Sequence, residues 1–161
     1  MKSTARLLLP ALLALGACHQ AKDPAPAPTT QVKPGIVLSD GRLVLPAVPG
    51  NPAAAYFTIA NQADAAAHVV KVSVSGASSA EMHESMAGEM RPIAVLDLPP
   101  GGHLLFAPGG RHVMVFGLPA SIKPGAKLDL MLQFRSGHVA TTQLTAESAG
   151  GMDAMPGMDH H

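Results

Sequence analysis

Short runs of alternating or β-branched apolar residues recur through the middle of the chain, separated by turn-forming residues. Residues 127–134, for example, alternate apolar and polar positions with the period of two that is typical of a half-buried β-strand. Clusters of glycine, proline, asparagine and aspartate lie between the runs. The runs expected to be strands are 42–45, 54–60, 68–74, 93–98, 103–106, 111–116, 127–134 and 138–144. About seven to nine short strands in one compact domain predict an all-β sandwich or small barrel.

The N-terminus has a different pattern. An apolar run at 7–16 follows the positive charges of Lys2 and Arg6. It is shorter than the roughly 20 residues that cross a bilayer, and it has the length of a signal-peptide core. Cys18, the only cysteine, lies where a bacterial lipobox has its lipidated cysteine. We therefore expect a lipoprotein signal peptide at 1–17, lipidation of Cys18 and a membrane-anchored protein of the periplasm. An ordinary secretory signal with an incidental cysteine is the alternative.

Two segments of low core content flank the predicted domain. Residues 18–35 are rich in proline and alanine, a composition typical of a disordered, semi-extended linker. Residues 148–161 are rich in glycine, methionine and histidine and are expected to be a flexible tail. This leaves one domain at 36–147. Acidic and basic residues are equal in number, 11 of each, so nothing indicates binding to nucleic acid.

Histidine and methionine supply the candidate chemistry, with eight and nine copies in the chain. His112 and Met114 lie two residues apart in a predicted strand, so both side chains project from the same face. His83 and Met90 flank residues 84–89, which we interpret as the connection of a hairpin. A hairpin brings its ends together, so these four side chains could converge on one metal ion.

The donor types favour copper. Mg²⁺ and Ca²⁺ prefer oxygen ligands, and Zn²⁺ sites rarely use methionine. Imidazole and thioether without thiolate suit Cu(I) in an oxidising compartment, where free cysteines are lost to disulfides. Methionine also fills gaps in cores, and we expect that role for Met131. From residue types alone, the metal site and core packing remain equally open for the other four.

The segment 81–118 resembles the PCuAC family of periplasmic copper chaperones. The family motif is a histidine, then a methionine, then 21 residues, then His-x-Met, and here 21 residues separate Met90 from His112. The local sequences at 90–92 and 108–114 also match, and the similarity covers about residues 36–146. One departure is that six residues, where the family usually has ten, separate His83 from Met90. Met82 and Met86 therefore stay open as substitute or additional ligands.

The resemblance implies a cupredoxin-like (immunoglobulin-like) β-sandwich. Two histidines and two methionines would close the coordination of the ion, which favours holding and transfer over catalysis, so we do not expect an enzyme. The resemblance also implies a copper chaperone that binds Cu(I) and passes it on, to the copper centre of a cytochrome c oxidase subunit or to another copper chaperone. A copper-buffering or resistance lipoprotein without a dedicated target is the alternative. The implied Cu(I) ligands are His83, Met90, His112 and Met114.

The tail carries a second group of soft donors, spaced by glycine, aspartate, alanine and proline. These are Met152, Met155, Met158, His160 and His161. Such a segment can wrap an ion, and its imidazoles and aspartates could also accept Cu(II). A chance-biased tail or a tag remnant is the alternative.

Truncation after Ala149 is expected to leave one tight Cu(I) site and to remove a second, weaker copper. Ordering the tail around an ion costs roughly 1 to 2 kcal/mol for each residue, so its affinity should be lower than that of a preformed site. Copper stoichiometry of the whole and truncated chains checks this. Equal stoichiometry would mean that the tail holds no copper.

Overall fold

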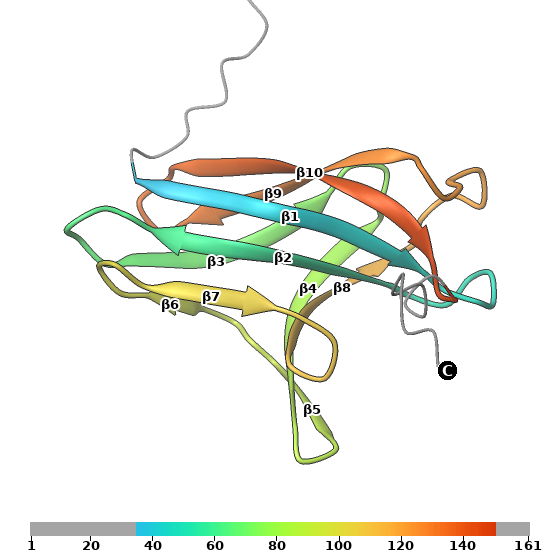
Figure 1. Ribbon diagram of the computed structural model, residues 1–161, viewed down its shortest axis with the longest axis horizontal. Coiled ribbons are helices and arrows are strands. Elements are labelled where there is room, and N and C mark those ends of the chain that lie inside the picture. The colour runs from blue at the N-terminus through green and yellow to red at the C-terminus, as the bar shows by residue number, and fades with distance from the viewer. Residues whose placement is uncertain (1–34, 151–161) are drawn as a thin grey trace, which may run out of the picture.

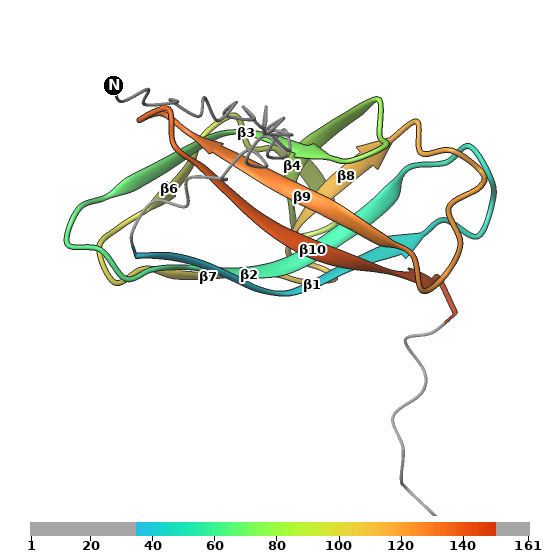
Figure 2. The ribbon, with the colours of Figure 1, turned by 90° about the horizontal axis from the view of Figure 1, so that it is seen from above.

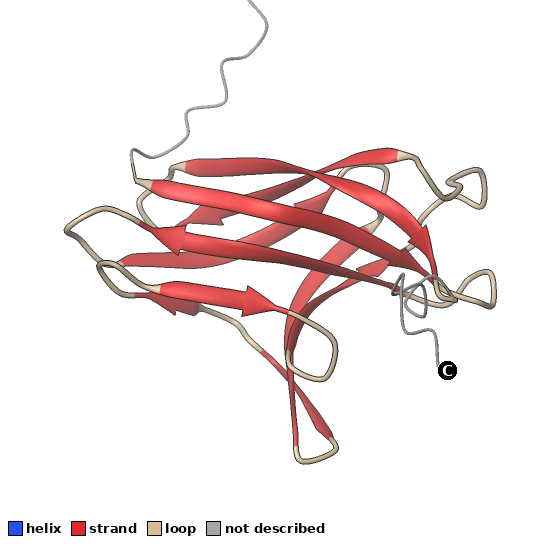
Figure 3. Cartoon of the chain, in the orientation of Figure 1, coloured by secondary structure: helices blue, strands red, loops and turns tan. Residues whose placement is uncertain are grey.

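The computed structural model describes residues 35–150, which consist of strands, turns and loops (Figure 3). The predicted all-β fold is confirmed. No helix capable of crossing a bilayer occurs in this part of the chain. The strands are β1 (Ile36–Leu45), β2 (Ala53–Asn61), β3 (Ala67–Val74), β4 (Ser79–Met86), β5 (Glu89–Pro92), β6 (Leu96–Leu98), β7 (His103–Phe106), β8 (Arg111–Phe116), β9 (Lys127–Phe134) and β10 (Val139–Ser148).

All ten strands belong to one hydrogen-bonded sheet in the order β5-β4-β8-β7-β2-β1-β10-β9-β3-β6. The sheet curls back on itself, because β3 and β4 are in contact although they lie near opposite ends of this order. Seen from above, β1, β2 and β7 form one side of the resulting sandwich and β3 and β4 the other (Figure 2). The pair β1–β10 is parallel, so the described chain begins and ends at opposite ends of the sandwich (Figure 1).

The core lies between the two layers and is built from alternate strand positions. In β9 every second residue is buried, ending with Phe134. Phe57 and Phe106 stack with their ring centroids 4.3 Å apart. Met131 lies between two buried leucines of β9 and is 43% exposed, so its predicted core role is wrong. Because side-chain direction alternates along a strand, the side chain of Met131 points away from the core.

The predicted strand at 93–98 exists only as β6, at its C-terminal half. The preceding residues carry the chain from β5, which pairs with β4, to β6, which pairs with β3. These pairs lie at opposite ends of the strand order, so the backbone here cannot stay in one ladder.

The hairpin of β4 and β5 projects from the body of the sandwich (Figure 1). Its last pair is Met86 with Glu89, so only two residues form the turn. Ala87 and Gly88 have φ angles of 53° and 86°, and positive φ at both positions defines a type I′ turn. The prediction that 84–89 form the connection is therefore wrong, because the connection is only residues 87 and 88. A type I′ turn matches the twist of its flanking strands, which lets pairing continue to the tip.

Replacing Ala87 with asparagine should raise the free energy of unfolding by about 0.5 kcal/mol, because asparagine tolerates positive φ better than alanine. Gly88→Ala should lower it by about 1 kcal/mol through the same backbone preference, since nothing lies within 4 Å of the added methyl group. Urea unfolding and amide exchange in β5 measure both effects. Gly110→Ala is the control, since Gly110 does not have positive φ and its added Cβ meets only the Ala107 carbonyl oxygen at 3.7 Å. No change at positions 87 and 88 would contradict the turn assignment.

Candidate metal centre

His83 and His112 are direct cross-strand partners in the antiparallel pair β4–β8. Directly opposed residues project from the same face of a sheet, and here the two imidazole centroids are 6.0 Å apart with 28° between the ring planes. Metal–imidazole bonds are about 2 Å long. The separation of the two rings is therefore short enough for one ion to be shared between them.

Two methionines lie on the same face as these histidines. Met114 follows His112 by two residues in β8. Met90 pairs with Ser85, which follows His83 by two residues in β4, so Met90 is the diagonal neighbour of His83. Met114 is half-buried and Met90 is 53% exposed. We name these four residues, His83, Met90, His112 and Met114, the His–Met face.

His112 is 8% exposed, and its Nδ1 lies 3.0 Å from the carbonyl oxygen of Gly110. A carbonyl only accepts, so Nδ1 donates a hydrogen and the lone pair of the neutral ring is on Nε2. The same carbonyl accepts a hydrogen bond from the backbone N–H of Ser85 at 3.2 Å. The turn before β8 thus ties the imidazole of His112 to the neighbouring strand.

His83 is held through its other nitrogen. Its Nε2 lies 3.2 Å from Oε2 of Glu81, and a carboxylate also only accepts. The lone pair of neutral His83 is therefore on Nδ1, which is buried and has no hydrogen-bond partner. Leaving a buried polar atom unpaired is costly, and a bound cation would remove that cost.

Met82 and Met86 lie on the opposite face of β4. Met82 pairs with the buried Val113 and is itself in the core at 4% exposure. Met86 pairs with Glu89 at the hairpin tip, where it is 66% exposed. Since alternate residues of a strand face opposite ways, neither methionine points toward the imidazole of His83.

The charged neighbours pair among themselves. Glu84 and Arg111 form an ion pair at 2.9 Å on the side of the sheet away from the His–Met face, and Glu89 pairs with Arg91 at 2.6 Å. His68 contacts Asp97 at 2.6 Å, while His103 and His138 are exposed. Residues 35–150 contain no group of three or more His, Cys, Asp or Glu side chains able to hold a metal.

The remaining predicted sites, on Cys18 and the five tail residues, lie outside the described residues.

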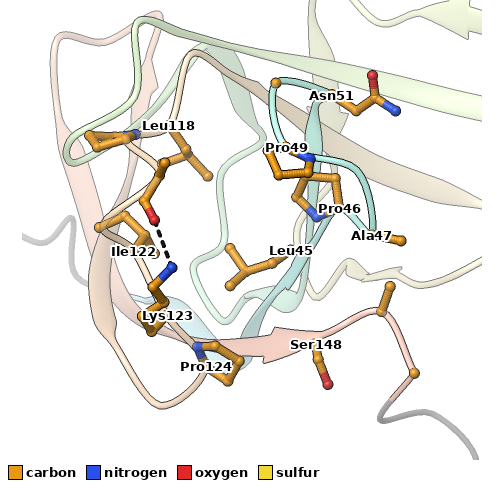
Figure 4. Close-up of a pocket in the computed structure, with 15 residues that line it drawn as sticks. Leu45, Pro46, Ala47, Pro49, Asn51, Leu118, Ile122, Lys123, Pro124 and Ser148 are labelled. Atoms are coloured by element: carbon orange, nitrogen blue, oxygen red, sulfur yellow. Dashed lines mark hydrogen bonds between the residues drawn. The ribbon is translucent and has the colours of Figure 1, made fainter.

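A separate, mainly apolar cavity of about 470 Å³ lies between the loops at the end of β10 (Figure 4). Leu45, Leu118 and Ile122 contribute to its lining together with several prolines. The Nζ of Lys123, at its rim, donates to the carbonyl of Ala120. None of the residues lining this cavity is histidine or methionine, so it offers no soft donor.

Comparisons with known proteins agree with this architecture. A family model described as "Putative lipoprotein LpqE-like" matches residues 36–146. A relative described as "Putative lipoprotein Lxx21020", from Leifsonia xyli subsp. xyli, is 31% identical in an alignment of 103 residues that covers 61% of this chain. The match spans 62% of that relative, less than two thirds of its length.

Solved structures with the same fold include two that contain copper. A copper-bound PCuAC domain from PmoF2 superposes with a TM-score of 0.60 at 23% identity, covering 71% of this chain and 93% of that domain. The solution structure of CuI-DR1885 from Deinococcus radiodurans gives 0.58 at 24% identity, with coverages of 73% and 80%. These likenesses confirm the cupredoxin-like sandwich and the resemblance in fold to PCuAC domains.

The different burial of Met82 and Met86 predicts different effects on stability when each is replaced. Met82→Ala should lower the free energy of unfolding by about 2 to 5 kcal/mol, because it removes a buried core side chain. Met86→Ala should change it by less than about 0.5 kcal/mol, because that side chain is exposed. Denaturant unfolding compares the two variants. Equal losses would contradict the assignment of Met82 to the inner face.

Proposed function

We propose that this chain, which belongs to the LpqE-like lipoprotein family, binds Cu(I) on its His–Met face and passes it to another protein. One observation carries the proposal: strand pairing gathers two imidazoles and two thioethers on a single face. They come from three adjacent strands, β5, β4 and β8, so pairing in the sheet sets the backbone positions of all four residues. A site formed in advance does not have to order its ligands on binding.

The donor chemistry supports copper in its reduced state. Thioether and neutral imidazole carry no charge and are soft or borderline ligands, which suit Cu(I) better than hard cations. The strands present no cysteine, and methionine keeps its donor sulfur where thiols are oxidised. Two solved proteins of the same fold are described as copper-bound and Cu(I)-bound.

The uneven exposure of the ligands supports transfer. His112 is nearly buried, whereas Met90 lies on the projecting hairpin and is half exposed. A recipient could displace the exposed thioether first while the imidazoles still hold the ion. We extend the proposal to a periplasmic protein anchored by lipid at Cys18 that delivers copper to a cytochrome c oxidase subunit or to another copper chaperone. Copper buffering would use the same site without a dedicated recipient.

Replacing His112 or Met114 with alanine should weaken Cu(I) binding by more than about tenfold, because each change removes a donor from the ion. Substituting a residue that only hydrogen-bonds to a metal ligand already lowers metal affinity by about tenfold or more. Competition with a Cu(I) chelator under reducing, anaerobic conditions measures the affinity. His103→Ala and Met131→Ala are matched controls, since both side chains are exposed on other strands. Unchanged affinity in both site variants would refute the site.

X-ray absorption of the Cu(I)-loaded chain identifies the ligand atoms in the same variants. The wild type should show both nitrogen and sulfur neighbours, with one nitrogen lost in His83→Ala. An identical first shell in that variant would assign the role of His83 to another residue.

A further inference from the structure

Glu81 is an acidic residue on the same side of the sheet as the His–Met face. It precedes His83 by two residues in β4 and is the cross-strand partner of Met114, so it projects from the same face as both. Its side chain is 58% exposed, and Oε2 of its carboxylate lies 3.2 Å from Nε2 of His83. The other two glutamates of this hairpin pair with arginines, Glu84 with Arg111 and Glu89 with Arg91. Glu81 is thus the hairpin glutamate whose hydrogen-bond partner is a histidine.

This contact makes the two imidazoles chemically different. The Gly110 carbonyl keeps hydrogen on Nδ1 of His112, whereas the Glu81 carboxylate keeps hydrogen on Nε2 of His83. The atoms left with lone pairs are Nε2 of His112 and Nδ1 of His83. The second of these is the buried nitrogen that has no hydrogen-bond partner.

We infer that Glu81 is a positioning residue that selects Nδ1 of His83 as the atom that binds copper, an inference that rests on the proposed function. An imidazole whose second nitrogen donates to a carboxylate is fixed in tautomer and orientation, and it becomes a more basic ligand. His112 receives the equivalent support from the backbone, which no side-chain substitution removes. Glu81 provides the corresponding contact for His83 from an exposed side chain, so this contact can be deleted without opening the core.

Nitrogen-15 spectra of the histidine side chains test the assignment in the whole chain. At mildly alkaline pH, where imidazole is neutral, copper-free protein should show the Nε2–H tautomer for His83 and the Nδ1–H tautomer for His112. Addition of Cu(I) should then shift the Nδ1 resonance of His83 and the Nε2 resonance of His112. Binding of His83 to copper through Nε2 would overturn the inference.

Variants of Glu81 separate positioning from direct ligation. Glu81→Ala should give His83 a mixture of tautomers and weaken Cu(I) binding about tenfold, while the resonances of His112 stay unchanged. Glu81→Gln replaces the carboxylate with an amide that can either accept from Nε2 or donate to it, so the tautomer selection should weaken and the affinity should fall between those of wild type and Glu81→Ala. Glu84→Ala is the control, because this neighbouring glutamate pairs with Arg111 on the other face, and it should bind within about twofold of wild type.

The outcomes distinguish this inference from the proposed function. Equal copper affinity and equal tautomers in Glu81→Ala and Glu84→Ala would refute the role of Glu81 while leaving the copper site standing. An oxygen neighbour of Cu(I) that disappears in Glu81→Ala would make Glu81 a ligand and also refute positioning. If the wild-type chain binds no Cu(I), the proposed function fails, and the inference fails with it whatever the tautomers of the copper-free protein.

Discussion

The register between β4 and β8 is the constraint on which the candidate site depends. His83 lies opposite His112 only because Met82 and Val113, the next pair along, both face the core. A slip of one residue would turn every side chain of β4 to the other face, placing His83 in the core and Met82 outside. The hydrophobic inner face therefore fixes the polar outer face. Core packing and the gathering of soft donors are two consequences of one strand pairing.

The two turns next to the β4–β8 pair also help to form the candidate site. Before β8, the Gly110 carbonyl binds both the imidazole of His112 and the backbone of β4. At the hairpin tip, the two-residue turn allows pairing to continue from His83 to Met86. This tight turn places Met90 at a diagonal position beside His83, although fewer residues separate them than in the PCuAC pattern. A shorter connection thus still brings the thioether to the same face.

The site combines buried and exposed parts. The side chain of His112 is only 8% exposed, and Nδ1 of His83 is buried. Met90 and the Glu81 carboxylate lie at the solvent side of the same face. A buried imidazole nitrogen without a partner is unfavourable in a protein that binds nothing there, and it is intelligible in one that receives a cation. This contrast accords with a protein that holds an ion and releases it.

The sequence by itself determined those features that depend only on the spacing of residues within one strand. The alternation of 127–134 predicted β9, and the two-residue spacing of His112 and Met114 placed both on one face, because side-chain direction repeats every two residues. Local spacing does not say which strands pair or in what register. Only the tertiary structure decided that His83 faces His112, that Met82 is buried, and that only 96–98 of the predicted strand 93–98 pairs in the sheet. These outcomes depend on packing between residues distant in the chain, which the local pattern does not encode.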